Sequence, residues 1–109
     1  MRLPHLELAV VPLEKITDYL LDESHPDGRG KAAFFLHVGF SRSNPEAMIW
    51  ALLNLVGQSD MTAQETGFGV KYAGAGPMVC PNGRVIQVVS VWMLRMGEPP
   101  PYFVTAYPA

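Results

Sequence analysis

The sequence of 109 residues has little of several features that mark particular protein classes. Its single cysteine, Cys80, excludes an internal disulfide framework and a zinc site built from several cysteines. Charged residues make up only 17% and hydrophobic residues 49%, which excludes an intrinsically disordered chain. No apolar run is long enough to span a bilayer, and the N-terminus lacks the apolar core of a signal peptide. We therefore expect one cytoplasmic domain over residues 1–109, with no contact to a membrane.

Positive charge is also scarce. Eight Lys and Arg residues against ten Asp and Glu residues give a net charge of −2, so no overall electrostatic attraction to nucleic acid is predicted. Residues 1–65 hold five cations and nine acids, whereas residues 66–109 hold three cations and one acid. This asymmetry fits an anion-facing C-terminal half, and it fits equally well a few cations scattered on a solvated sheet rim.

Helical periodicity dominates the first half of the chain. Apolar residues at helical spacing predict a short helix over about residues 13–22, which the turn signals in residues 23–30 end. A second short helix is predicted within residues 31–40 with Gly39 as its C-cap, although its aromatic content leaves a strand possible. Asn44 and Pro45 predict a third helix that begins with an Asn44 side-chain cap and ends at Gly57. Because that helix is apolar nearly all round, we expect it at the centre of the core.

From residue 66 the hydrophobic period changes to two, which is typical of strands. After a loop at residues 58–66, strands are predicted over residues 66–74 and 76–80. An Asn82-Gly83 hairpin turn then leads to a long strand at residues 84–96, and a last strand covers residues 102–108. The long strand is apolar on both faces, which predicts a central strand covered on both sides, if need be by a partner molecule.

These elements predict an α+β fold. Two or three helices, in about residues 1–60, pack on a three- to four-stranded antiparallel sheet, in about residues 66–108. Core positions are expected for Trp50 and Trp92, and a half-buried helical position for His37.

The turn SHPDGRGK, residues 24–31, is the first candidate site. A turn with two glycines that enters a helix presents backbone N–H groups to an anion. His25 beside Arg29 and Lys31 adds an acid–base group and positive charge, as phosphate chemistry requires. The glycine spacing is not that of a nucleotide-binding P-loop. The alternative is a plain interhelical turn in which His25 caps the preceding helix.

The final strand, YFVTAYP, is the second candidate. Strand alternation predicts Phe103, Thr105 and Tyr107 on one face, and it places the two hydroxyls about 7 Å apart, a spacing suited to a phosphodiester. The alternative is that these residues are ordinary strand formers. Lys71 and Arg84 can each reach a ligand phosphate, or else serve as charges that protect a sheet edge.

Other kinds of site find no support in the sequence. No cluster of Cys, His and carboxylate residues has metal-ligand spacing, so we predict neither a metal nor a cofactor. Cys80 has no evident activating base nearby in the sequence, so we predict no thiol mechanism.

Five blocks in order, KITDYLLDESHPDGRGKAAFF, FGVKY, PNGR, VSVW and VTAYP, resemble a bacterial domain family that shares YLL…HPxGxxKAxFF and a terminal VTAYP. The resemblance covers the chain from about Leu3 to Pro108. Similar domains occur alone and as C-terminal modules of polymorphic toxins. The order of helices and antiparallel sheet is similar to the metal-independent endoribonucleases of the barnase–EndoU–colicin–RelE group. A pI of about 5.8 departs from the basic character of such ribonucleases.

The resemblance implies a toxin-like endoribonuclease in which the 2′-hydroxyl of RNA attacks the adjacent phosphorus without a metal. His25 would be the general base or acid, and the other implied catalytic residues would neutralise or orient the phosphate: Lys31, Arg84, Thr105 and Tyr107. Arg29 and Lys71 would bind substrate. The implied partners are RNA and a cognate antitoxin or immunity protein, in the cytoplasm of the producing cell or of a target cell. The alternative is a non-catalytic, antitoxin-like interaction domain that self-associates as a homodimer through its sheet.

Overall fold

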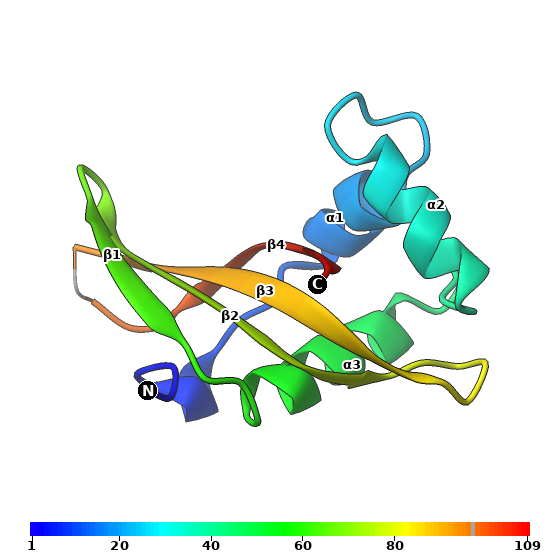
Figure 1. Cartoon of the computed structure of the whole chain (residues 1–109). Helices are drawn as coiled ribbons and strands as arrows, with labels where there is room; N and C mark the ends of the chain where they lie inside the picture. The colour runs from blue at the N-terminus through cyan, green and yellow to red at the C-terminus, as the bar shows by residue number, and fades with distance from the viewer. Residues whose placement is uncertain (97) are drawn as a thin grey trace.

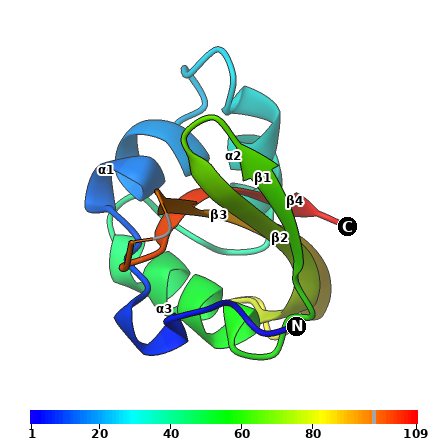
Figure 2. The same cartoon turned by 90° about the vertical axis from the view of Figure 1, so that its left-hand side faces the viewer.

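The computed structural model describes residues 1–96 and 98–109 and has the α+β architecture that the sequence predicts. Four antiparallel strands form one sheet in the order β1-β2-β3-β4. Helix α3 packs against β2 and β3, α1 lies against β4, and α2 packs on the segment that continues α1 (Figure 1). Figure 2 shows α3 on the opposite side of the molecule from the upper end of α2. Within the described residues, no helix combines the length and the apolar character needed to cross a membrane.

Three helical segments lie where helices were predicted. Helix α1 (Leu13–Lys15) continues directly into a π-helical turn, η2 (Ile16–Leu20), and a short 3-10 helix precedes them at Leu6–Leu8. Helix α2 (Arg29–His37) confirms a helix rather than a strand, and Gly39 follows its C-cap with φ of 109°, a conformation that glycine adopts readily.

Helix α3 (Pro45–Val56) begins and ends as predicted, but two expectations about it are wrong. Asn44 stands at the N-cap position, yet its side chain makes no capping hydrogen bond. Trp50 is 66% exposed, so the helix buries one broad face rather than its whole circumference. His37, expected to be half-buried on α2, is exposed as well.

The strands are β1 (Thr62–Thr66), β2 (Gly69–Val79), β3 (Val85–Arg95) and β4 (Tyr102–Pro108). The predicted hairpin turn is confirmed, with φ of 87° at Gly83, and β3 is the predicted central strand. Residues 62–66 were wrongly assigned to a loop, because all five side chains of β1 are exposed and therefore show no polarity alternation. The two strands predicted over residues 66–80 are one strand, and Phe68 lies in the turn before it.

Cross-strand partners share a face, so the register assigns each residue to one side of the sheet. Val88, Ser90, Trp92 and Leu94 are buried on the side of α3. The other side, which we call the open face, carries the alternating positions: Lys71, Ala73, Ala75, Val89, Val91, Met93, Arg95, Thr105 and Tyr107. Of these positions only Val91 is buried, so no layer fully covers the second face of β3.

A register shift between Val91 and Trp92 changes the alternation along β4. Phe103 pairs with Trp92 and is 1% exposed, so it lies in the core and not beside Thr105 as predicted. Thr105 and Tyr107 pair with Val91 and Val89 and stay on the open face. The irregularity thus places Phe103 in the core and leaves the hydroxyls of Thr105 and Tyr107 on the open face.

The core centres on Trp92, which is fully buried as predicted. Its ring packs edge-to-face against Phe103, with centroids 5.4 Å apart. Its indole Nε1–H donates to the Oγ of Ser90 at 2.9 Å, and Ser90 is itself fully buried. This bond satisfies the polar atom of the largest core side chain.

We predict that Ser90→Ala destabilises the domain, because it leaves a buried indole N–H without an acceptor. The expected loss in free energy of unfolding is about 1–3 kcal/mol, measured by urea denaturation. Gln87→Ala, at an exposed position of the same strand, is the control and should change stability by less than about 0.5 kcal/mol. Equal midpoints for Ser90→Ala and the wild type would contradict the prediction.

Candidate functional site

Predicted site residues from the two halves of the chain meet at Tyr19, which the sequence analysis did not single out. The Oη atom of Tyr19 lies 2.8 Å from Thr105 Oγ1 and accepts a hydrogen bond from Lys31 Nζ at 2.7 Å. The imidazole of His25 packs edge-on against the Tyr19 ring, with centroids 5.0 Å apart. His25, Lys31 and Thr105 therefore belong to one cluster.

The backbone positions these groups through a close approach at Gly28. A Cβ atom at this buried residue would lie 2.6 Å from the Tyr19 carbonyl oxygen. Only glycine therefore lets the turn before α2 lie directly on η2. Because Gly28 is also the N-cap of α2, this contact fixes the first turn of α2, and with it Lys31, over Tyr19.

A second ammonium group, that of Lys15, also lies near the phenol. Lys15 Nζ is 5.4 Å from the centroid of the Tyr19 ring, Lys31 Nζ is 5.3 Å from it, and Lys15 also donates to the Val104 carbonyl at 3.3 Å. We call Lys15, Tyr19, His25, Lys31 and Thr105 the Tyr19 cluster. Among the described residues the one ion pair joins the N-terminal ammonium and Asp60, so neither lysine is neutralised by a carboxylate.

This surrounding charge acts on Tyr19. Partial burial by itself raises the pKa of the phenol. The hydrogen bonds with Lys31 and Thr105 and the positive charges of Lys31 and Lys15 together outweigh that effect, so the pKa of Tyr19 lies below its ordinary value of 10.0. The cluster therefore favours a negatively charged oxygen at its centre.

His25 also makes hydrogen bonds within its own turn. Its Nδ1 accepts hydrogen bonds from the backbone N–H groups of Asp27 at 3.0 Å and Gly28 at 3.2 Å. The imidazole thus closes the turn that precedes α2, and it does not cap the preceding helix, as the alternative interpretation had it. Since both bonds need the Nδ1 lone pair, the neutral ring carries its proton on Nε2 and acts as a donor there.

The other predicted residues divide into two groups. Tyr107 lies two positions beyond Thr105 on the open face, about 7 Å along the strand, and Lys71 is on the same face opposite Met93. Arg84, in contrast, is seven residues from Val91, the partner of Thr105, which is about 23 Å along β3. Arg29 is exposed and two positions from Lys31, so the two side chains do not share a helix face.

Charge on the open face is of one sign. Its strand positions include Lys71 and Arg95, and the Tyr19 cluster adds two ammonium groups at its border. Glu65, the one acid in the described strands, pairs with Val70 on the side of α3. The charged strand positions on the open face are thus all cationic, although the chain has a net charge of −2.

Two other kinds of chemistry find little support in the geometry. Within residues 1–96 and 98–109, no three His, Cys, Asp or Glu side chains lie together where they could hold a metal ion. Burial raises the pKa of the Cys80 thiol, against an opposing effect of the Arg84 charge, so the thiol is not activated as a nucleophile.

Sequence reasoning missed Tyr19 and Lys15, although both lie in the first predicted helix. Tyr19 occupies an apolar position of the helical pattern, and such a position is typical of a residue that faces the core. The one available signal was spacing: Lys15 and Tyr19 are four residues apart, as neighbours on one helix face are.

Comparisons with known proteins add a family and a fold. A family model described as "Domain of unknown function (DUF6883)" matches residues 2–109. No curated protein matches the chain in sequence. A chain of the solved "Contact-dependent growth inhibition toxin - immunity protein complex from Klebsiella pneumoniae 342" is similar, with a TM-score of 0.71 and 15% identity over 97% of both chains. At this identity the likeness establishes a common fold.

We predict that Tyr19 ionises at a lower pH than an ordinary tyrosine. In a titration followed by phenolate absorbance near 295 nm, Tyr19→Phe should lose a component that appears below pH 10.0 in the wild type. Lys31→Met should shift that component to higher pH, because it removes a hydrogen-bond donor and a positive charge. Arg42→Met, outside the cluster, is the control. A Tyr19→Phe curve that differs from the wild type only above pH 10.0 would contradict the described cluster.

Proposed function

The chain belongs to the DUF6883 family, and we propose that it is a toxin-type endoribonuclease domain that cleaves RNA by 2′-hydroxyl attack without a metal. The observation that carries the proposal is the Lys31–Tyr19–Thr105 hydrogen-bonded chain, flanked by a second lysine, with neither lysine in an ion pair among the described residues. The fold that it has in common with a chain of a toxin–immunity protein complex supports a toxin-related role.

The first requirement of such a reaction is stabilisation of charge on the phosphoryl oxygens. Lys31 and Lys15 supply two ammonium groups beside Tyr19. Because neither is held in an ion pair among the described residues, both are available to a phosphodiester. Thr105 Oγ1 adds a hydrogen-bonding group that orients the phosphate.

The second requirement is movement of two protons. The 2′-oxygen forms a bond to phosphorus while its proton goes to Tyr19 Oη, whose lowered pKa makes the ionised form more accessible. The bond from phosphorus to the 5′-oxygen breaks, and this oxygen takes up a proton from solvent. The products are a 2′,3′-cyclic phosphate and a free 5′-hydroxyl.

His25 fits a hydrogen-bonding role better than the role of a general acid or base. Its Nδ1 is occupied by two backbone N–H groups, so Nε2 is its proton-bearing nitrogen. We assign the Nε2–H group to a hydrogen bond with a phosphoryl oxygen. Tyr107 and Lys71 extend the same face, where they contact neighbouring parts of the RNA. Arg84 and Arg29 are left out of the chemical step, because the fold holds them apart from the cluster.

The proposal predicts that the purified domain cleaves single-stranded RNA in the presence of EDTA and leaves a 2′,3′-cyclic phosphate. Tyr19→Phe and Lys31→Met should each lower kcat about 10²–10⁴-fold, because each removes a group of the proton-transfer and charge-stabilising set. A 2′-O-methyl group at the cleavage position should block the reaction. Thr105→Val should also lower activity, because it removes the hydroxyl that orients the phosphate. Thr62→Val, on the exposed strand β1, is its matched control and should leave activity unchanged.

Two substitutions separate the two roles of His25, which hydrogen-bonds to the turn before α2 and also packs against Tyr19. His25→Asn keeps an acceptor for the two N–H groups and removes the imidazole, whereas His37→Ala removes an exposed histidine of α2. Loss of activity in His25→Asn with unchanged stability supports the donor role. Full activity in His25→Asn would leave His25 only the structural role of closing the turn before α2. Metal-dependent cleavage by the wild type would overturn the proposed mechanism.

A second candidate is that the chain is the partner-binding member of a toxin–immunity pair. The observation that favours it is the accessible sheet face, together with the similar fold of a chain from a complex of a toxin and an immunity protein. We predict that expression of this chain alone arrests bacterial growth and that Tyr19→Phe relieves the arrest. Normal growth with the wild-type chain, and protection from a co-expressed toxin, would favour the second candidate.

A further inference from the structure

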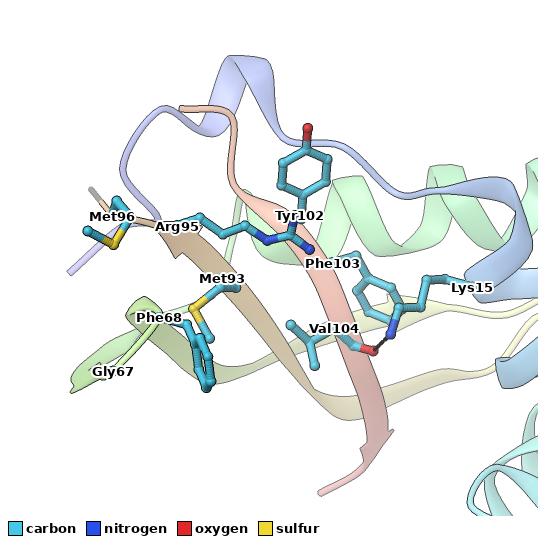
Figure 3. Close-up of a pocket in the computed structure, with 9 residues that line it drawn as sticks. All are labelled: Lys15, Gly67, Phe68, Met93, Arg95, Met96, Tyr102, Phe103 and Val104. Carbon is cyan, nitrogen blue, oxygen red and sulfur yellow. Dashed lines mark hydrogen bonds between the residues drawn. The ribbon is translucent and has the colours of Figure 1, made fainter. Parts of the chain in front are cut away.

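The open face is hollowed next to the Tyr19 cluster (Figure 3). The hollow has a volume of about 590 Å³, within the range of small-ligand sites. It lies between the β1–β2 turn, the ends of β3 and β4, and the side chain of Lys15. Its apolar walls come from Phe68, Met93, Met96 and Val104.

Two of these walls are large hydrophobic side chains that the fold does not bury. Phe68 is 78% exposed and Met96 is 79% exposed. Both are nevertheless fixed by their backbones: Phe68 N–H donates to Thr66 Oγ1 at 3.1 Å, and Met96 N–H donates to the Phe68 carbonyl at 3.2 Å. Met96 is held at φ of 53°, which is unusual for a residue other than glycine. The backbone on which both side chains stand is therefore held in place beside the hollow.

Charge at the rim is positive. The guanidinium carbon of Arg95 lies 5.2 Å from the centroid of the Tyr102 ring, and Lys15 lies at the other side of the hollow (Figure 3). Lys15 also borders the Tyr19 ring and donates to Val104, so one residue joins the hollow to the cluster. An occupant that suits both features is flat and apolar in its body and carries negative charge at its edge.

We propose that this hollow is a nucleobase subsite, which takes one unpaired base of single-stranded RNA against Phe68 while the adjoining phosphate lies between Lys15 and Lys31. The proposal rests on the proposed ribonuclease function. Aromatic side chains stack on the face of any base, and the positive rim tracks the phosphate backbone. A base in a duplex cannot enter, so the domain should prefer unpaired RNA.

The test uses a short single-stranded RNA in which every ribose is 2′-O-methylated, so that it binds without cleavage. It carries the fluorescent base 2-aminopurine at one position at a time. Wild type should quench the fluorescence at one position through stacking, and Phe68→Ala should lose the quenching and bind roughly 5- to 150-fold more weakly. Phe68→Tyr should bind like wild type. Trp50→Ala, which removes an exposed aromatic from α3, is the control.

Cleavage kinetics on unmodified RNA separate this proposal from the proposed function. Phe68→Ala should raise KM with little change in kcat, whereas Tyr19→Phe should lower kcat. If wild type cleaves RNA and Phe68→Ala matches Trp50→Ala in both assays, the subsite is overturned and the ribonuclease function stands. If wild type binds and quenches without cleaving, the subsite stands and the enzyme is overturned. If wild type neither binds nor cleaves, both are overturned, and a protein partner becomes the occupant to test.

Discussion

The hydrogen bond between Tyr19 and Thr105 is the constraint on which the candidate site depends. It joins a π-helical turn in the first quarter of the chain to the last strand of the sheet. Lys31 donates a hydrogen bond to the same oxygen, and the ammonium groups of Lys15 and Lys31 lie 5.4 and 5.3 Å from the centroid of the same ring. Each of these contacts needs the Tyr19 hydroxyl or its ring in place. The site therefore forms only when the helical segment and the sheet have assembled.

Much of the fold could be predicted because local signals and tertiary packing agree. The Asn82-Gly83 turn has a conformation that its residues favour, and the apolar run of β3 requires a central position. Strand β1 could not be predicted, because its exposed side chains show no alternation and its pairing with β2 alone makes it a strand. Phe103 was placed on the wrong face because the register shift beside Trp92 arises from packing between strands.

The site was partly predictable for a similar reason. His25, Lys31 and Thr105 have chemistry that sequence reasoning recognises, and the fold brings them together around one ring. Tyr19 could not be recognised, since an aromatic residue in a helical pattern is usually a core residue. Arg84 shows the converse error: its side chain is suitable, but sequence gives no distance, and the length of β3 separates it from the cluster.

The first turn of α2 carries Arg29 and Lys31 and no acid. Cations at the positive end of a helix dipole are unfavourable, each by roughly 0.3–1 kcal/mol, and no side-chain hydrogen bond caps this end. The chain thus gives up some helix stability to keep this end positive. An anion bound at the same end would relieve the repulsion. The melting temperature of the domain should therefore rise when an anionic ligand binds there and be lowest in the free protein.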